Sequence, residues 1–454
     1  MSSARTSAPR AADDEKHASA PGLRSDPSET TLTPGSNPDP ETQSPAPATT
    51  SDPGPVPDGG LEAWLQVLGS WVVLAATWGL VNTFGVYQTY YEQTLNATPS
   101  AISWIGSLQG ALLMMVGPIS GPLYDAGYFR ELLWVGLFLI LFGQFMTSLC
   151  TTYWQVLLAQ GVCIGLGCGL TFLPSTAILS QYFLKRRSFV IGIAATGSPI
   201  AGMVFPIIFG RLEPKIGFGW ATRIMGFILL ALSVIPAVSM HTRLPPSGHK
   251  RSLVDKTALR DPAFMLVMLG SFCGFLSMYV AFFYIQLFAN THDIGTTSFS
   301  AYFVTLLSAG SIPGRVIPNY LADKIGALYI QIFLAAGAAV MMLAWLGINN
   351  MAGLIVFAII YGLFSGGMVS IAPSVIVSLS PDLGRVGTRM GMMFFTSSIS
   401  ILVGTPIAGA ILGEYSEHEW QAMIGYGAAA LTAGSICYTL AKIFQLKGER
   451  ELKA

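Results

Sequence analysis

The sequence of 454 residues has little charge, cysteine or histidine. Asp, Glu, Lys and Arg make up 11% of it, whereas a soluble protein carries roughly 25%. The 24 basic and 24 acidic residues cancel, so no basic excess is present to neutralise the phosphates of a nucleic acid. Five cysteines, an odd number, give no paired disulfide framework. No two of the five histidines have metal-ligand spacing on a helix, and no nucleophile or phosphate-binding loop motif is present, which argues against an enzyme and against nucleotide binding.

The chain is instead rich in apolar residues (52%) and glycine (49 residues), with a mean hydropathy of +0.57. Apolar runs of about 20 residues recur from Trp64 onward, long enough to cross a hydrocarbon core of about 30 Å. This pattern predicts an all-α membrane protein with twelve transmembrane helices in two six-helix bundles. The expected spans are residues 65–90, 101–124, 131–149, 153–181, 187–209, 218–240, 263–289, 297–321, 327–348, 352–378, 386–411 and 420–443.

The first 57 residues differ from the rest of the chain. They contain 11 of the 27 prolines, 12 of the 48 charged residues and no aromatic residue. Such a segment buries too little apolar surface to offset its ordering entropy, so we expect a disordered cytoplasmic tail. The predicted organisation is a tail, a first bundle, a cytoplasmic central loop, a second bundle and a short cytoplasmic tail, at residues 1–57, 58–242, 243–262, 263–446 and 447–454.

The basic residues predict the orientation in the membrane. With the N-terminus in the cytoplasm, 20 of the 24 Lys and Arg residues fall on the cytoplasmic side, as the positive-inside rule requires. Both termini are therefore expected inside the cell, most simply at the plasma membrane. Asn96-Ala97-Thr98 would then lie outside as a glycosylation site, although Pro99 weakens the motif.

The two halves contain related segments at equivalent places, after the second and the eighth span. Each has an aspartate followed two or three residues later by glycine, which permits a tight turn with a carboxylate beside it. Duplication within a six-plus-six pattern indicates a transporter. The two segments are Gly121-Pro-Leu-Tyr-Asp125-Ala-Gly127-Tyr-Phe-Arg130 and Asn319-Tyr-Leu-Ala-Asp323-Lys324-Ile-Gly326.

These segments resemble the G-x-L-x-D-R/K-x-G signature of the major facilitator superfamily. Two further motifs resemble its monocarboxylate-porter branch, especially the fungal members: Asp58-Gly59-Gly60 leading to Trp64, and Tyr182-Phe183-Leu184-Lys185-Arg186-Arg187 followed by Gly192, Ala194 and Gly197. The resemblance covers about residues 58–446 and implies the major facilitator fold and alternating access. It implies conformational or gating roles for Asp125, Gly127, Arg130, Asp323, Lys324, Gly326 and Arg187, although Lys185–Arg187 also serve as an ordinary positive-inside cluster.

Arg315 is the one basic residue clearly within a predicted span. The resemblance implies that an arginine at this place binds a substrate carboxylate, for which a guanidinium offers a planar pair of donors. The alternative is that Arg315 reaches the cytoplasmic face or braces the gate near Asp323. Ser311 and Val86 stand where proton-coupled members carry an acid and a lysine, which leaves ion or proton coupling open; no cofactor or metal is expected.

Polar and aromatic residues in cavity-lining spans are further candidates for substrate contact: Asn82, Gln88, Gln160, Tyr279, Tyr284 and Gln286. For any single amide, an interhelical hydrogen bond is the commoner role. The aromatic run 272–288 suits either lipid-facing packing or a pocket for a bulky substrate. Glycine pairs four residues apart, such as Gly310 and Gly314, predict close helix packing.

The sequence thus predicts a monomeric transporter, secondary active or facilitative, in the lipid bilayer. Its partner would be a small organic substrate, with export of an organic acid or a secondary metabolite favoured. Two alternatives stay open: uptake of a small monocarboxylate or vitamin-like nutrient, and a nutrient sensor on the same fold.

Overall fold

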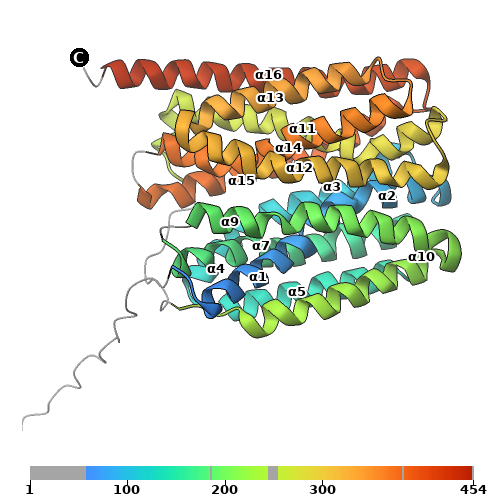
Figure 1. Ribbon diagram of the computed structural model, residues 1–454, viewed down its shortest axis with the longest axis horizontal. Helices are drawn as coiled ribbons and strands as arrows, with labels where there is room; N and C mark the ends of the chain where they lie inside the picture. The colour runs from blue at the N-terminus through green and yellow to red at the C-terminus, as the bar shows by residue number, and fades with distance from the viewer. Residues whose placement is uncertain (1–57, 185–186, 244–253, 381–382, 452–454) are drawn as a thin grey trace, which may run out of the picture. The chain divides into compact units, whose positions relative to one another are not determined.

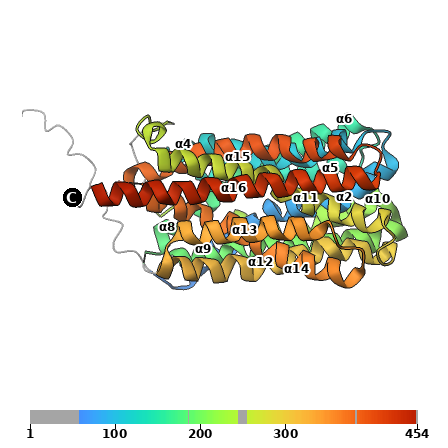
Figure 2. The ribbon, with the colours of Figure 1, turned by 90° about the horizontal axis from the view of Figure 1, so that it is seen from above.

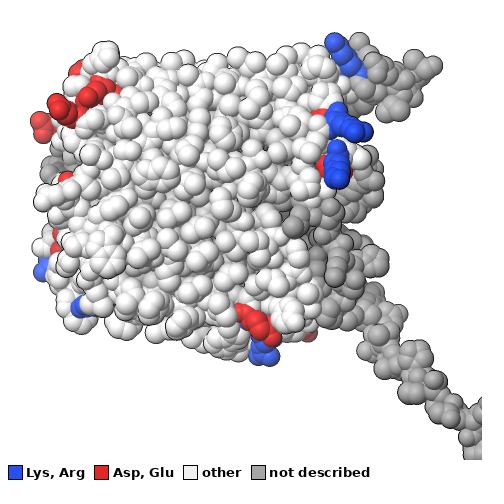
Figure 3. Space-filling view, turned by 180° about the vertical axis from the view of Figure 1, so that it is seen from behind, with Lys and Arg blue, Asp and Glu red and all other residues white. Residues whose placement is uncertain are grey.

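The computed structural model describes residues 58–184, 187–243, 254–380 and 383–451. The expected N-terminal tail, half of the expected central loop and the last three residues lie outside these ranges. Within them, the helices run roughly along one direction (Figure 2). The charged side chains on the face shown in Figure 3 gather toward the two ends of the helices, and the surface between them is almost free of charge, as a membrane-facing belt requires.

The first half contains α1 to α10. Its elements are α1 (Leu61–Ala76), α2 (Trp78–Thr94), α3 (Pro99–Met115), α4 (Gly117–Asp125), α5 (Phe129–Thr147), α6 (Tyr153–Val156), the π-helix η1 (Leu157–Ile164), α7 (Gly165–Ala177), α8 (Leu179–Tyr182), α9 (Arg187–Ala195) and α10 (Gly197–Ser239). Gly217, with φ +78°, divides α10 into the expected fifth and sixth spans.

The second half contains longer, less interrupted helices. They are α11 (Pro262–Thr291), α12 (Thr297–Ile325), α13 (Ala327–Trp345), α14 (Met351–Leu379), α15 (Leu383–Leu412) and α16 (Glu417–Glu451), preceded by the short 3-10 turn η2 (Ala258–Arg260). Local sequence explains several of the starts. Asp261 accepts hydrogen bonds from the amides of Ala263 and Phe264 at the start of α11, and Asn350 caps α14 in the same way.

The described helices match the twelve expected spans. Ten segments are long and apolar enough to cross a membrane, and one of these, Phe189–Ser239, holds the two helices that meet at Gly217. The remaining helix, α12, is 29 residues long and is not among these ten apolar segments. Two boundaries differ from the expectation: the first span continues to Thr94 rather than 90, and α16 continues as helix to Glu451 rather than ending near 443.

The two halves lie against each other, the first below and the second above in Figure 1. The seam between them is formed by α3 against α15, α10 against α12, and α2 against α11. Glycine residues allow the closest approaches between helices. A Cβ on Gly85 of α2 would collide with the Phe282 carbonyl oxygen of α11, and one on Gly310 of α12 with the Ile359 carbonyl oxygen of α14. The predicted packing role of the paired glycines is therefore confirmed at Gly310.

Candidate functional site

Arg315 lies at the seam between the halves, with 8% of the residue exposed. Its guanidinium extends from α12 to the first half, where Nη1 donates to the Ala195 carbonyl oxygen (3.4 Å) and Nη2 to the Ser198 hydroxyl (3.5 Å). Its buried Nε has no hydrogen-bond partner among the described residues. The side chain therefore does not extend to the surface, and it holds donors with spare capacity for an acceptor.

Asn82 is connected to Arg315 through Ser198. The Asn82 amide donates to the Ser198 hydroxyl at 3.3 Å, so that one serine joins α2, α10 and α12. Ser308, about two turns before Arg315 on α12, has a buried hydroxyl without a partner among the described residues. Sequence reasoning identified Asn82 and Arg315 but missed both serines, because a small polar residue within an apolar span carries no distinguishing pattern.

An aromatic cluster lies beside this polar group, and we call Trp78, Phe172, Tyr279 and Phe283 the seam aromatics. The rings of Trp78 (α2) and Tyr279 (α11) stack across the seam, with centroids 6.5 Å apart and planes 7° from parallel. Phe172 packs edge-on against Trp78, with ring centroids 5.7 Å apart, and the centroids of the Phe283 and Tyr279 rings are 5.9 Å apart.

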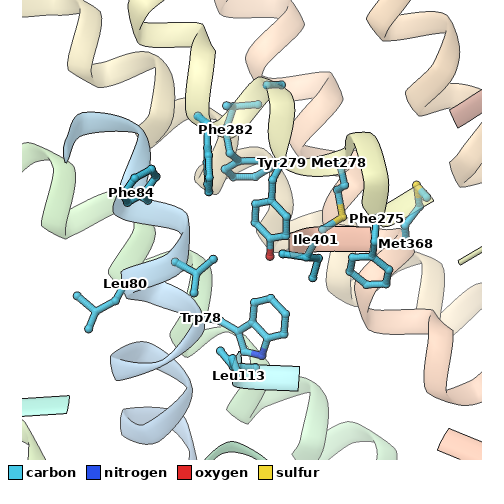
Figure 4. Packing of buried hydrophobic residues seen from close by; sticks show 14 of the residues in the cluster. Trp78, Leu80, Phe84, Leu113, Phe275, Met278, Tyr279, Phe282, Met368 and Ile401 are labelled. Carbon is cyan, nitrogen blue, oxygen red and sulfur yellow. The ribbon is translucent and has the colours of Figure 1, made fainter. Parts of the chain in front are cut away.

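The seam aromatics adjoin apolar side chains of the second half and the buried guanidinium of Arg315. Figure 4 shows Phe275, Met278 and Ile401 around the Tyr279 ring. Tyr279 and Arg315 also lie close enough to interact electrostatically. An apolar aromatic wall beside the buried cation of Arg315 can accept an organic molecule that carries one acidic group.

The other candidates lie elsewhere. Gln160, in the π-helix η1, accepts a hydrogen bond from the Tyr91 hydroxyl (2.7 Å) within the first half. Tyr284 bonds to the Ser103 hydroxyl and, at 3.4 Å, to the Thr405 carbonyl oxygen. Gln286 is 9% exposed, and its Oε1 has no partner among the described residues. The structure thus brings together Asn82, Tyr279 and Arg315, whereas Gln160, Tyr284 and Gln286 make their contacts elsewhere.

One ionisable residue was missed. Glu92 was not among the candidates identified from the sequence, and it lies in the last turn of α2, because the helix runs four residues beyond the expected end of that span. The Glu92 carboxylate accepts hydrogen bonds from the Gln88 amide (2.8 Å) and from the Tyr415 hydroxyl (3.1 Å). Glu92 was missed because the expected span ended at residue 90, just before this glutamate.

The duplicated turns require glycine. Gly127 and Gly326 have φ of +96° and +98°, a conformation that L-residues with a side chain rarely adopt. Arg130 and Lys324 are exposed, and the Lys324 ammonium lies 4.5 Å from the centre of the Tyr320 ring. The side chains of Asp125, Asp323 and Arg187 lie outside the described residues, so their gating roles stay predictions.

The two motifs that resemble the monocarboxylate-porter branch pack on each other. The Asp58 carboxylate accepts a hydrogen bond from the Leu184 amide (2.7 Å), and the Asp58 amide donates to the Tyr182 carbonyl oxygen (3.1 Å). Trp64 packs edge-on against Phe183 with centroids 5.7 Å apart. The start of the first helix is thereby fixed to the end of α8.

Within the part of the chain that the structure describes, no three His, Cys, Asp or Glu side chains are grouped to hold a metal ion. The seam presents the Arg315 guanidinium, small hydroxyls, an amide and aromatic rings, all of which can contact an organic ligand.

Comparison with known proteins identifies the class. Residues 67–405 match the model of the Major Facilitator Superfamily. The chain is 41% identical over 382 residues to the MFS-type transporter dbaD of Emericella nidulans, covering 84% of this chain and 86% of the relative. It is 35% identical over 398 residues to the aspyridones efflux protein apdF of the same organism, covering 87% and 80%.

A solved structure has the same fold. The crystal structure of the peptide transporter POT in complex with sulfate superposes with a TM-score of 0.68 at 15% identity, covering 86% of this chain and 97% of that one. The protein belongs to the major facilitator superfamily, and the named relatives are transporters.

Proposed function

We propose that this protein is a secondary transporter that exports an organic metabolite with an apolar, ring-containing body and one acidic group. The two halves would alternate access to the seam, where Arg315 takes the acidic group and the seam aromatics take the apolar body. The observation that carries the proposal is the buried Arg315 guanidinium, with its unpartnered Nε, beside the stacked Trp78 and Tyr279 rings.

Export is favoured by the relatives. One of them is named an efflux protein for aspyridones, at 35% identity over most of both chains. That name belongs to the relative, and it supports an exporter of organic metabolites here without fixing the compound. The monocarboxylate-porter type is a finer proposal, supported by the interlocking motifs around Asp58 and Leu184 and by the position of Arg315.

Uptake of a small monocarboxylate is the second candidate. It would use Arg315 in the same way, but it leaves the seam aromatics without a role, because a small acid offers little surface for two stacked rings. A nutrient sensor on the same fold would bind a ligand without moving it, so substrate flux separates it from both transport proposals.

We infer a multi-pass protein of the plasma membrane with both termini in the cytoplasm and a monomer as the working unit. The exposed Asn96, between α2 and α3, would then face the outside. A shift in electrophoretic mobility on glycosidase treatment that is absent in Asn96→Gln would support this orientation.

The direct test is flux through the purified full chain in proteoliposomes, read by mass spectrometry across a panel of aromatic acids, aliphatic monocarboxylates and neutral metabolites. The proposal predicts saturable, protein-dependent flux of bulky acids in preference to acids of two to four carbons. Preferential flux of the small acids would favour uptake of monocarboxylates, and binding without any flux would favour a sensor.

A further inference from the structure

The carboxylate of Glu92 lies partly buried at the end of the seam that the basic residues predict to face outward. Glu92 belongs to the last turn of α2, next to the start of α3 and to the connection between α15 and α16. Its two hydrogen-bond donors, the Gln88 amide and the Tyr415 phenol, are both neutral. A carboxylate within a membrane protein is normally paired with a cation, because the charged form is costly to withdraw from water.

The ionisable groups around Glu92 supply no such cation among the described residues. Tyr415, from the connection, and Tyr284, from α11, interact with it electrostatically. On α10, Glu213 interacts with Tyr90 instead, and Arg211 donates to the Tyr302 hydroxyl of α12. At the end of α11, His292 pairs with Glu417. No ion pair links Glu92 to Arg211, Lys215, Arg223 or His292, and α3 has no charged residue.

The contact of Glu92 with Tyr415 joins the two halves of the protein, since α2 belongs to the first and Tyr415 to the second. Tyr415 has φ of +65°, in a region that a bulky residue enters only under strain. The surrounding structure therefore holds this tyrosine in a strained conformation, and its hydroxyl reaches Glu92. Nearby, the Ser100 hydroxyl of α3 donates to the Pro406 carbonyl oxygen of α15 (2.8 Å), a second contact that closes the same end.

We propose that Glu92 is a proton-binding site of the outer gate, and that binding a proton there favours closure. Opening this end separates α2 from Tyr415 and exposes the carboxylate to water. Closing it leaves the carboxylate with two neutral donors, an environment that disfavours the charged form relative to the neutral one. By linkage, acid on the outer side shifts the gate toward the closed state and alkali shifts it toward the open state.

The inference rests on the alternating access proposed above, but its test uses no substrate, so it can fail while the transport proposal stands. Ser100→Cys is introduced into the full chain in lipid nanodiscs, and the rate of labelling by a maleimide is measured from about pH 5.5 to about pH 8, around the range in which a buried carboxyl titrates. The rate is divided by that of Asn96→Cys, on the exposed connection, to remove the pH dependence of the thiol. The unsubstituted chain has five cysteines of its own, so its labelling is subtracted from that of each cysteine variant.

The expected result is a ratio that rises about threefold or more toward alkaline pH, because deprotonation opens the gate around residue 100. In Glu92→Gln the ratio stays low and does not vary with pH, since the amide is neutral throughout. The matched control is Glu414→Gln, an exposed glutamate next to Tyr415, which should keep the full pH response.

A full pH response in Glu92→Gln, or a flat ratio in the unsubstituted background, would overturn the proposal. Tyr415→Phe provides a second variant in case Glu92→Gln does not accumulate. It removes one of the two donors to the carboxylate in the closed state, so the rise toward alkaline pH should become larger. A response equal to that of the unsubstituted background would also contradict the proposal.

Discussion

Arg315 of the second half donates through Nη2 to the hydroxyl of Ser198 in the first half, at a distance of 3.5 Å. The same hydroxyl accepts from Asn82 at 3.3 Å, so Ser198 is shared by two donors from opposite sides of the seam. Alternating access requires this junction to change when the halves move apart. The acidic group of a substrate would then take the place of the Ala195 carbonyl and the Ser198 hydroxyl as acceptor. Because that group is charged, its hydrogen bonds with the guanidinium would be stronger.

The stacked rings of Trp78 and Tyr279 provide the first prediction. Replacing Tyr279 by alanine removes the aromatic surface, whereas Tyr279→Phe keeps it. We expect Tyr279→Ala to raise the KM for a bulky aromatic substrate about two- to tenfold, as the loss of one aromatic contact of about 0.5–1.5 kcal/mol implies. Flux in proteoliposomes measures it, and an equal loss in Tyr279→Phe would instead indicate a role for the hydroxyl.

The close contact of α12 with α14 provides the second prediction. A Cβ on Gly310 would collide with the Ile359 carbonyl oxygen, so Gly310→Ala should destabilise the protein by about 1–3 kcal/mol. Gly425, on α16, has no atom within 4 Å of the place of a Cβ, which makes Gly425→Ala the matched control. The melting temperature of the purified protein should fall in the first variant only. An equal melting temperature in both variants would show that α12 and α14 do not need this contact.

The third prediction concerns pH. The pKa of Asp255 is lowered from 3.8 to about 2, first because the Thr257 hydroxyl donates to its carboxylate and then because Arg389 does, at 2.6 Å and 3.1 Å. A carboxyl whose pKa is lower in the folded state contributes stability above its unfolded pKa and loses it as the pH falls toward the folded pKa. This contribution is therefore complete near neutral pH and disappears between pH 3.8 and about 2.

Asp255→Asn tests this pH dependence. Its melting temperature should lie below that of the unsubstituted protein at neutral pH, and the difference should shrink as the pH falls below 3.8. Glu414→Gln, which alters an exposed carboxyl, should show no comparable difference. A constant difference for Asp255→Asn down to the lowest accessible pH would show that its carboxyl does not act through ionisation.

The sequence was sufficient to predict the helical architecture, because apolar runs and glycine spacing are local signals. The glycine turns at Gly127 and Gly326 were predictable for the same reason. The environment of Arg315 could be predicted only in part. Its burial followed from its position within a span. Its contact with Ser198, 117 residues away in the sequence, depends on how two helices pack against each other. The pairing of Asp58 with Leu184 is likewise a tertiary contact, and neither motif specifies its partner.

Glu92 shows how a boundary error can hide a functional candidate. A polar run that begins near residue 90 looks like the end of a span, yet the helix continues through it, because Tyr90, Tyr91 and Phe218 pack together there. Packing against a distant segment supplied the stabilisation that local hydropathy did not indicate.

The proposed role of Arg315 is tested most directly by comparing acids with their neutral amides. Flux of each acid and of its matching amide is measured in proteoliposomes for the unsubstituted protein, for Arg315→Gln and for Lys447→Gln, which removes an exposed cation of α16. Hydrogen bonds to a charged group contribute about 1.5–3 kcal/mol, so Arg315→Gln should reduce kcat/KM for the acids about ten- to hundredfold and leave the amides nearly unchanged. Lys447→Gln should transport both as the unsubstituted protein does. Transport of the acids by Arg315→Gln at the unsubstituted rate would contradict the assignment of Arg315 as the anion-binding residue.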